Sequence, residues 1–160
     1  MGGVVVLDLI FELRENEQYD LFSDNFFTFT TLIYKLSEKR RRATGTMRVI
    51  RIENCPLEDI KSIKKKIRGS FDFQNSKNLK MVRWKDNSCI TLASNHYGFE
   101  PIAQTKRWLN IDEKFIEIDQ PNILSQYKKK LLEAPIVWIK TFHTTGVPYG
   151  LKTVGALVFV

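Results

Sequence analysis

Apolar residues follow two successive patterns between Tyr19 and Leu36. The first, from Tyr19 to Asp24, is a short run that ends in a carboxylate, which predicts a buried strand. The second begins at Phe26, where apolar residues recur at intervals of three and four as far as Leu36. This spacing predicts an amphipathic helix. The helix would end in a basic segment, residues 37–42, and cations stabilise the last turn of a helix through its dipole.

The pattern before residue 19 fits two structures. The β-branched residues from Val4 to Val6 favour a strand, whereas Val6, Leu9, Ile10 and Leu13 also fall on one face of a helix. The spacing leaves both alternatives open.

After residue 42 the pattern changes to short strand-like runs separated by polar breaks. The best-defined pair predicts an antiparallel hairpin of Lys80–Trp84 with Cys89–Ala93 around Asp86 and Asn87, residues that tolerate a tight turn. The other runs predict strands at 43–52, 70–73, 102–109 and 114–118, and a basic segment at 58–69 that is either helix or loop.

The composition is that of a packed domain with unevenly spread charge. Hydrophobic residues make up 43% of the 160 residues and charged residues 27%, which argues against wholesale disorder. The net charge is +7. Residues 1–38 hold seven acidic and two basic side chains, whereas residues 39–68 hold eleven basic and three acidic. The basic middle indicates either a polyanionic partner such as DNA or a solvated charged surface.

The cysteine and histidine content argues against a zinc site. Cys55 and Cys89 are far apart, and the histidines of the sequence are His96 and His143. We therefore expect two free thiols in a reducing compartment. No run approaches the ~18 apolar residues of a transmembrane helix. The start at Met1 lacks the basic region and cleavage pattern of a signal peptide.

Eight short motifs occur in the order SDNFFT, ATGTMR, CPL, RGSFDF, VRWKDN, TLASN, KRW and QPNILSQY. Each is weak alone, but in register they resemble the transposase domain of the piggyBac family over about residues 2–127. The resemblance implies an α/β chain of the α+β type, with part of an RNase H-like core interrupted by a β-rich insertion. It also implies that Gly3–Leu13 is a helix and that Asp24 ends a core strand.

The resemblance assigns a candidate role to Asp24. Members of the family cut and join DNA with three aspartates that hold two divalent metal ions, and Mg²⁺ suits such oxygen ligands. Asp24, in SDNFFT, matches the second aspartate, so it would be a relic of a catalytic residue and a weak metal ligand. The alternative is that Asp24 caps the following helix, because Asp is favoured at N-caps.

The other two aspartates of the family are not found in this sequence. The first is expected upstream of the part matched by Met1. The third belongs to a Gly-Gly-Val-Asp motif after QPNILSQY, where this chain departs from the family pattern. The tail from Lys128 onward holds one carboxylate, Glu133, which we interpret as a solvated helix residue rather than a replacement ligand. The cysteine-rich region of the family is also absent, and no cofactor is expected.

Basic and aromatic residues supply the candidate nucleic-acid contacts. Arg83-Trp84-Lys85 and Lys106-Arg107-Trp108 mix cations with indoles, a combination that suits nucleic acid. We interpret both tryptophans as core residues and leave the cations open, and we interpret His96 as a surface loop residue. The basic residues predicted to bind DNA are Lys39, Arg40, Arg41, Arg42, Lys64, Lys65, Lys66 and Arg68.

The sequence therefore predicts a partial core at 1–54, an insertion at 55–127 and a divergent tail at 128–160. The preferred function is a truncated piggyBac-like transposase-derived domain that neither cuts nor joins DNA, located in the nucleus or otherwise in the cytoplasm. The alternative is a module that binds DNA or protein, and an active nuclease would need carboxylates from another chain. A partial core would leave an unpaired strand edge and an uncovered apolar face. The apolar tail either covers that face or has no fixed structure, and exposed apolar surface would favour self-association.

Overall fold

The computed structural model describes residues 19–25, 27–52, 57–133, 138–140 and 155–159. Its helices are α2 (Thr30–Glu38), the 3-10 turn η1 (Val49–Arg51), α3 (Ile60–Lys64) and α4 (Asn122–Glu133). Its strands are β1 (Asp20–Ser23), β2 (Arg42–Thr46), β3 (Phe71–Asn75), β4 (Lys80–Lys85), β5 (Cys89–Ser94), β6 (Ala103–Leu109), β7 (Lys114–Gln120), β8 (Trp138–Lys140) and β9 (Gly155–Phe159).

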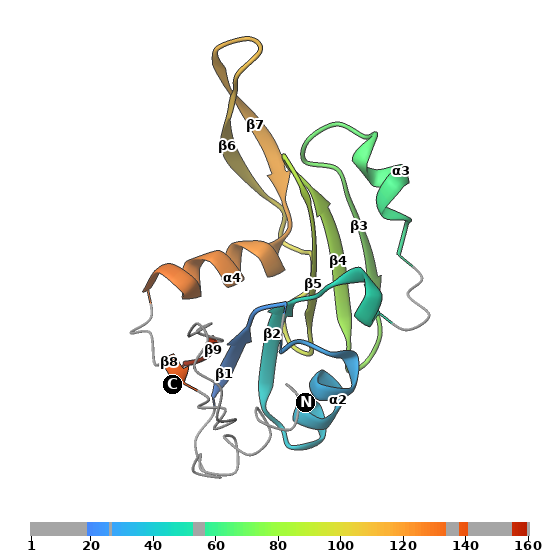
Figure 1. The fold of residues 1–160 in the computed structure, drawn as a ribbon, viewed down its shortest axis with the longest axis vertical. Helices are drawn as coiled ribbons and strands as arrows, with labels where there is room; N and C mark the ends of the chain where they lie inside the picture. Colours follow the sequence, from blue (N-terminus) through green and yellow to red (C-terminus); the bar gives the residue numbers. More distant parts are fainter. Residues whose placement is uncertain (1–18, 26, 53–56, 134–137, 141–154, 160) are drawn as a thin grey trace, which may run out of the picture.

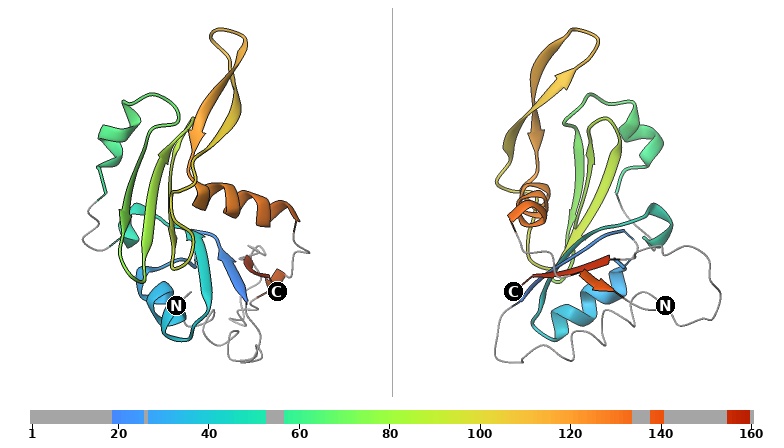
Figure 2. Two further views of the ribbon diagram at one scale, coloured as in Figure 1. Left: turned by 180° about the vertical axis from the view of Figure 1, so that it is seen from behind. Right: turned by 60° about the vertical axis from the view of Figure 1, so that its left-hand side comes forward.

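The strands form one seven-stranded sheet and one two-stranded arm. The sheet has the order β3-β4-β5-β2-β1-β9-β8, and β6 pairs with β7 in the arm. β1 and β2 are parallel, from Asp20 opposite Arg42 to Ser23 opposite Gly45, while the other neighbours are antiparallel. In Figures 1 and 2 the arm rises from the end of the sheet where the β4–β5 turn lies, with α4 at its root.

Helices cover both faces of the sheet. Successive residues of β1 point to opposite faces, so adjacent residues of β1 pack against different helices. Leu21 packs with Leu32 and Leu36 of α2 in one buried cluster. Phe22, which is fully buried, packs in another cluster with Leu124 of α4. The α+β class predicted from the sequence is confirmed, with β1 at the centre between the two helices.

The predicted hairpin is confirmed. β4 pairs with β5 antiparallel, from Lys80 opposite Ser94 to Lys85 opposite Cys89, with Asp86 at the turn. The predicted strands at 102–109 and 114–118 are also present, as the two strands of the arm. The basic segment at 58–69 contains only the short helix α3, whose N-cap residue Asp59 accepts a hydrogen bond from the backbone N–H of Lys61.

Two element boundaries predicted from the sequence are wrong. The helix begins at Thr30 rather than near Phe26, because Phe27 is buried in the preceding turn and its N–H bonds to the carbonyl of Asp24. The strand predicted at 43–52 ends at Thr46, the last residue paired with β5. No bounds were predicted for helix α4, but Glu133, interpreted as a helix residue, is its last residue, and its first residues belong to the motif QPNILSQY.

The tail contributes a strand beside β1. Residues Gly155–Phe159 pair antiparallel with β1, so that Asp20 lies opposite Phe159 and Phe22 opposite Leu157. The edge of β1 is therefore paired with a segment of the tail. The predicted helix at 3–13 lies outside the described residues. Within the described part of the chain, no helix is long and apolar enough to span a membrane.

Candidate functional site

Asp24 lies in the turn that follows β1, at the end where the parallel strands β1 and β2 both finish. Its carbonyl oxygen accepts the backbone N–H groups of Phe27 and Thr28 at 3.3 and 3.2 Å. The hydroxyl group of Thr28 donates to the same oxygen at 2.7 Å. These bonds fold the chain back after β1 and hold the half-buried Asp24 at the edge of the sheet.

Asp24 is not the N-cap of α2. The N-cap position is Phe29, five residues further on, and no side chain makes a capping hydrogen bond there. The capping alternative is therefore wrong, because the intervening turn separates the strand from the helix. Asp24 instead lies at the carboxyl end of a buried strand, before the turn that leads to α2.

Gly45 of β2 allows the turn to lie close to the sheet. A Cβ atom at this position would lie 2.8 Å from the carbonyl oxygen of Ser23, 2.5 Å from the Ser23 hydroxyl oxygen and nearer still to that of Thr28. The two hydroxyl groups, 2.8 Å apart, occupy this space and bond to each other. Because Gly45 has no side chain, the turn that contains Asp24 can pack directly against β2.

Tyr127 of α4 approaches the same end of β1 from the other face. Its hydroxyl group donates to the carbonyl oxygen of Ser23 at 3.2 Å. Burial raises the pKa of Tyr127, a hydrogen bond with Thr46 lowers it in part, and the charge of Asp24 raises it further. The phenol is therefore a neutral hydrogen-bond donor near Asp24 at physiological pH.

The described residues around Asp24 do not fit a two-metal site, which needs several carboxylates held together. The described part of the chain contains no group of three His, Cys, Asp or Glu residues that could hold a metal ion. The strand next to β1 is β9, and residues 134–160 contain no Asp or Glu. A cavity of about 330 Å³ near the end of β2 has no carboxylate either; it is lined by Asn25, Thr46, Met47, Arg48, Val49, Ile60, Cys89, Ile90 and Thr91. Glu133 is the last residue of α4.

The structure separates the basic residues predicted from the sequence into two places. The turn from α2 to β2, with Lys39 and Arg40 exposed, lies at the opposite end of the sheet from α3 (Figures 1 and 2). On α3 and just after it, Lys64, Lys65 and Lys66 are exposed. The two basic segments therefore do not form one continuous patch.

Three of the predicted DNA contacts are held by other groups of the protein. Arg41 is 8% exposed and lies 4.9 Å from the ring centroid of Tyr19. Arg42 is 3.6 Å from a carboxylate oxygen of Asp20. Arg68 donates to Asp86 and to the carbonyl oxygen of Trp108. Lys66 pairs with Glu58 at 2.6 Å but stays half exposed.

A network at the root of the arm joins residues that are distant in the sequence. Asp86 in the β4–β5 turn accepts hydrogen bonds from Nε of Arg68 at 2.8 Å and from Nε of Arg107 at 2.9 Å. Burial alone would raise the pKa of Asp86, but the hydrogen bonds from the two arginines outweigh it and hold the pKa below its usual range. Asp86 therefore ties the arm to the sheet as a carboxylate.

The two tryptophans of the mixed motifs differ in environment. Trp84 is 3% exposed, and its indole N–H donates to the carbonyl oxygen of Asp119 at 2.7 Å, so its interpretation as a core residue is confirmed. Trp108 is 47% exposed and meets Phe115 across the arm with 5.0 Å between ring centroids, so its interpretation as a core residue is wrong. Trp108 is exposed because β6 belongs to the arm, which projects beyond the seven-stranded sheet. The alternation of apolar and polar residues does not predict this position. His96 is exposed, as predicted.

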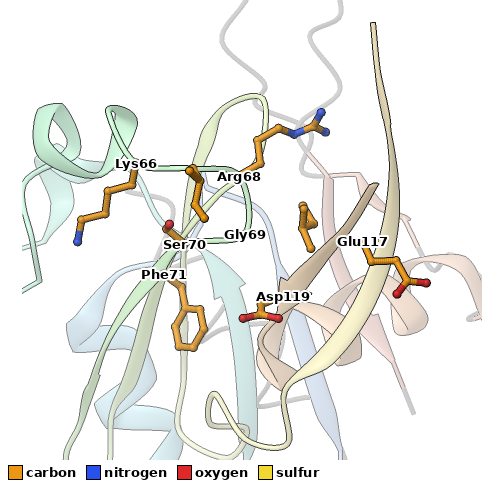
Figure 3. Close-up of a pocket in the computed structure, with 9 residues that line it drawn as sticks. Lys66, Arg68, Gly69, Ser70, Phe71, Glu117 and Asp119 are labelled. Carbon is orange, nitrogen blue, oxygen red and sulfur yellow. The ribbon is translucent and has the colours of Figure 1, made fainter. Parts of the chain in front are cut away.

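A shallow cavity of about 410 Å³ lies between the start of β3 and strand β7 (Figure 3). Lys66 and Arg68 line it from one side, and Glu117 and Asp119 line it from the other. Because both signs of charge meet there, the cavity does not favour an anion or a cation. Of the cysteines, Cys89 is a free thiol, and Cys55 lies outside the described residues.

Comparison with known protein families gives a match over most of the chain. The model of the Transposase IS4 family matches residues 2–134. The human PiggyBac transposable element-derived protein 2 is 36% identical over 135 residues, which are 82% of this chain and 23% of that protein. The human PiggyBac transposable element-derived protein 3 is 37% identical over 132 residues, covering 81% of this chain and 22% of that protein.

A solved structure shares the fold. The cryo-EM structure of the piggyBac transposase synaptic complex with hairpin DNA superimposes with a TM-score of 0.56 at 20% identity. The match covers 80% of this chain and 24% of that chain. The sequence thus spans about a quarter of the length of the proteins that it matches.

Proposed function

The chain belongs to the piggyBac-like Transposase IS4 family, and on this premise we propose that it is a transposase-derived domain that binds DNA without cutting it. The observation that carries the proposal is the environment of Asp24. The neighbouring strand β9 and the nearby cavity offer no carboxylate. A lone carboxylate binds Mg²⁺ weakly, because the ion keeps most of its waters without a cage of ligands.

The exposed cations support the binding part of the proposal. Lys39 and Arg40 at one end of the sheet, and Lys64, Lys65 and Lys66 at the other, lie on the surface, where a phosphate group can reach them. The related piggyBac transposase was solved as a synaptic complex with hairpin DNA. A protein of this kind acts where DNA is, so we propose a nuclear location.

The loss of cleavage is tested by Asp24→Asn in purified protein with a nicked or branched DNA substrate. We expect no metal-dependent cleavage by either the wild type or the variant in Mg²⁺ or Mn²⁺. Asparagine keeps the backbone carbonyl that organises the turn, so the free energy of unfolding should change by no more than about 1 kcal/mol. Neither metal ion should raise the melting temperature of the wild type by more than it raises that of the variant.

Asp112→Asn, at an exposed position near the tip of the arm, is the matched control for removing one negative charge. Cleavage that requires metal, is abolished by Asp24→Asn and survives in Asp112→Asn would contradict the proposal. It would show that ligands other than the described residues around Asp24 complete the site.

DNA binding is tested by the salt dependence of affinity for a labelled duplex. Each phosphate neutralised by the protein should contribute about −0.9 to the slope of log K against log salt concentration. Replacing Lys64, Lys65 and Lys66 by alanine should therefore make the slope shallower. Alanine at Lys35, Lys77 and Lys114, three exposed and scattered lysines outside the candidate contacts, removes the same charge and should change the slope less. A wild-type slope near zero would show that the basic segments do not contact DNA phosphates and are solvated surface.

A further inference from the structure

Four cations from separate parts of the chain meet at the root of the arm. Arg68 precedes β3, Lys85 ends β4, Arg107 belongs to β6 and Lys128 belongs to α4. The ammonium group of Lys128 lies 5.0 Å from the ring centroid of Trp84, and the guanidinium carbon of Arg107 lies 6.0 Å from it. We call these residues the arm-root cluster.

The arm-root cluster has more positive than negative charge. Asp86 bonds to Arg68 through one carboxylate oxygen and to Arg107 through the other. Lys85 donates only to the backbone carbonyl of Asp86, at 2.7 Å. Among the described residues, neither Lys85 nor Lys128 forms an ion pair with a carboxylate, so the single charge of Asp86 is shared by the whole cluster.

Lys128 is held in a position that disfavours its own charge. Burial lowers its pKa, the charge of Arg107 lowers it further, and the charge of Asp86 opposes both. The indole face of Trp84 attracts the ammonium group but supplies no full negative charge. An anion placed between Lys128 and Arg107 would remove the repulsion between these two side chains.

We propose that the arm-root cluster binds a phosphate group between Lys128 and Arg107, and that in the DNA complex this is a phosphate of the DNA backbone. The second part rests on the proposed function. Arg107 uses Nε for Asp86 and Nη1 for Thr105 and the carbonyl of Lys106, and none of these bonds involves Nη2. A guanidinium group fixed in this way presents a directed donor, and the ammonium group of Lys128, near the same indole ring, acts as a point charge.

The geometry favours a phosphate on a long polyanion over a small free anion. Arg68 and Lys85 belong to the same cluster, where both donate to Asp86. A DNA backbone that crosses the cluster would therefore meet additional cations, each releasing counterions and adding to the affinity. The arm-root cluster thus gives the DNA partner a defined contact at the junction of α4, the arm and the sheet.

The first test compares Lys128→Met with Lys129→Met in the salt-dependence measurement on duplex DNA. Methionine keeps an apolar stem against Trp84 and removes the charge. Lys128→Met should make the slope shallower by about 0.9, the contribution of one phosphate. Lys129→Met, which removes the same charge from the same helix, should change the slope by less than half as much. Equal slopes for the wild type and Lys128→Met would overturn the phosphate contact.

The second test uses the wild-type chain and inorganic phosphate, so it does not depend on DNA binding. The pKa of Lys128 is followed by NMR through its 13Cε resonance, assigned with Lys128→Met. Phosphate should raise this pKa relative to sodium chloride of the same ionic strength, and no rise would overturn the site. An equal rise with polyglutamate would also overturn it, because the surface would then accept carboxylates of an acidic protein.

The two tests separate the site from the proposed function. A phosphate-dependent rise without DNA binding would retain the phosphate site and reject the function proposed for the chain. DNA binding with an unchanged slope in Lys128→Met and no phosphate effect would retain that function and reject the site.

Discussion

Replacing Gly45 with valine is expected to lower the free energy of unfolding by about 3 kcal/mol, because the new side chain has no room. Its Cβ atom would overlap the hydroxyl groups of Ser23 and Thr28 and crowd the backbone carbonyl of Ser23. Thr28 is almost fully buried, so its side chain cannot turn out into solvent. The clash is resolved only if the turn that carries Asp24 moves away from β2.

Urea unfolding at neutral pH measures this effect. Gly98→Ala is the matched control, since a Cβ atom there meets its nearest neighbour, Cδ of Lys80, at an ordinary 3.7 Å. We expect the control to change stability by no more than about 0.5 kcal/mol. Comparable losses in both variants would mean that Gly45 has no special role in placing the turn.

Replacing Asp86 with asparagine is expected to lower the free energy of unfolding at neutral pH by about 2 kcal/mol. The substitution keeps the size of the side chain but removes the negative charge between Arg68 and Arg107. Two largely buried guanidinium groups then lack a counter-charge, and the arm loses its tie to the sheet. Asp112→Asn breaks the exposed pair with Lys114 and should have little effect, because solvent screens it.

The effect of Asp86 should depend on pH in a defined direction. Its pKa in the folded protein is lower than the ordinary value of 3.8. The carboxylate therefore stabilises the fold fully above about pH 3.8, and this stabilisation is lost as the pH falls towards the pKa of the folded state. The difference in stability between the wild type and Asp86→Asn should shrink over this acidic range. A constant difference down to about pH 2 would contradict the assignment.

The sequence determined the elements that depend on neighbouring residues. Alternation of side chains and a turn at Asp86 were enough to predict the β4–β5 hairpin, because the two faces of a strand require a period of two. The order of the short motifs was enough to indicate the family. It also placed Asp24 at the end of a buried strand, where the structure has it.

The tertiary structure decided what depends on residues far apart in the chain. The helix after Asp24 starts at Thr30 because the turn before it packs on β2, and the tail pairs with β1 through backbone groups that carry no sequence signal. Contacts between distant segments also decide which basic side chains can contact DNA. Arg41 is buried and Arg68 is held by Asp86, whereas Lys128, which no motif marked as a contact, lies against Trp84. A charge pattern counts cations along the chain, but only folding shows which of them meet a carboxylate, because burial and pairing are set by contacts between distant segments.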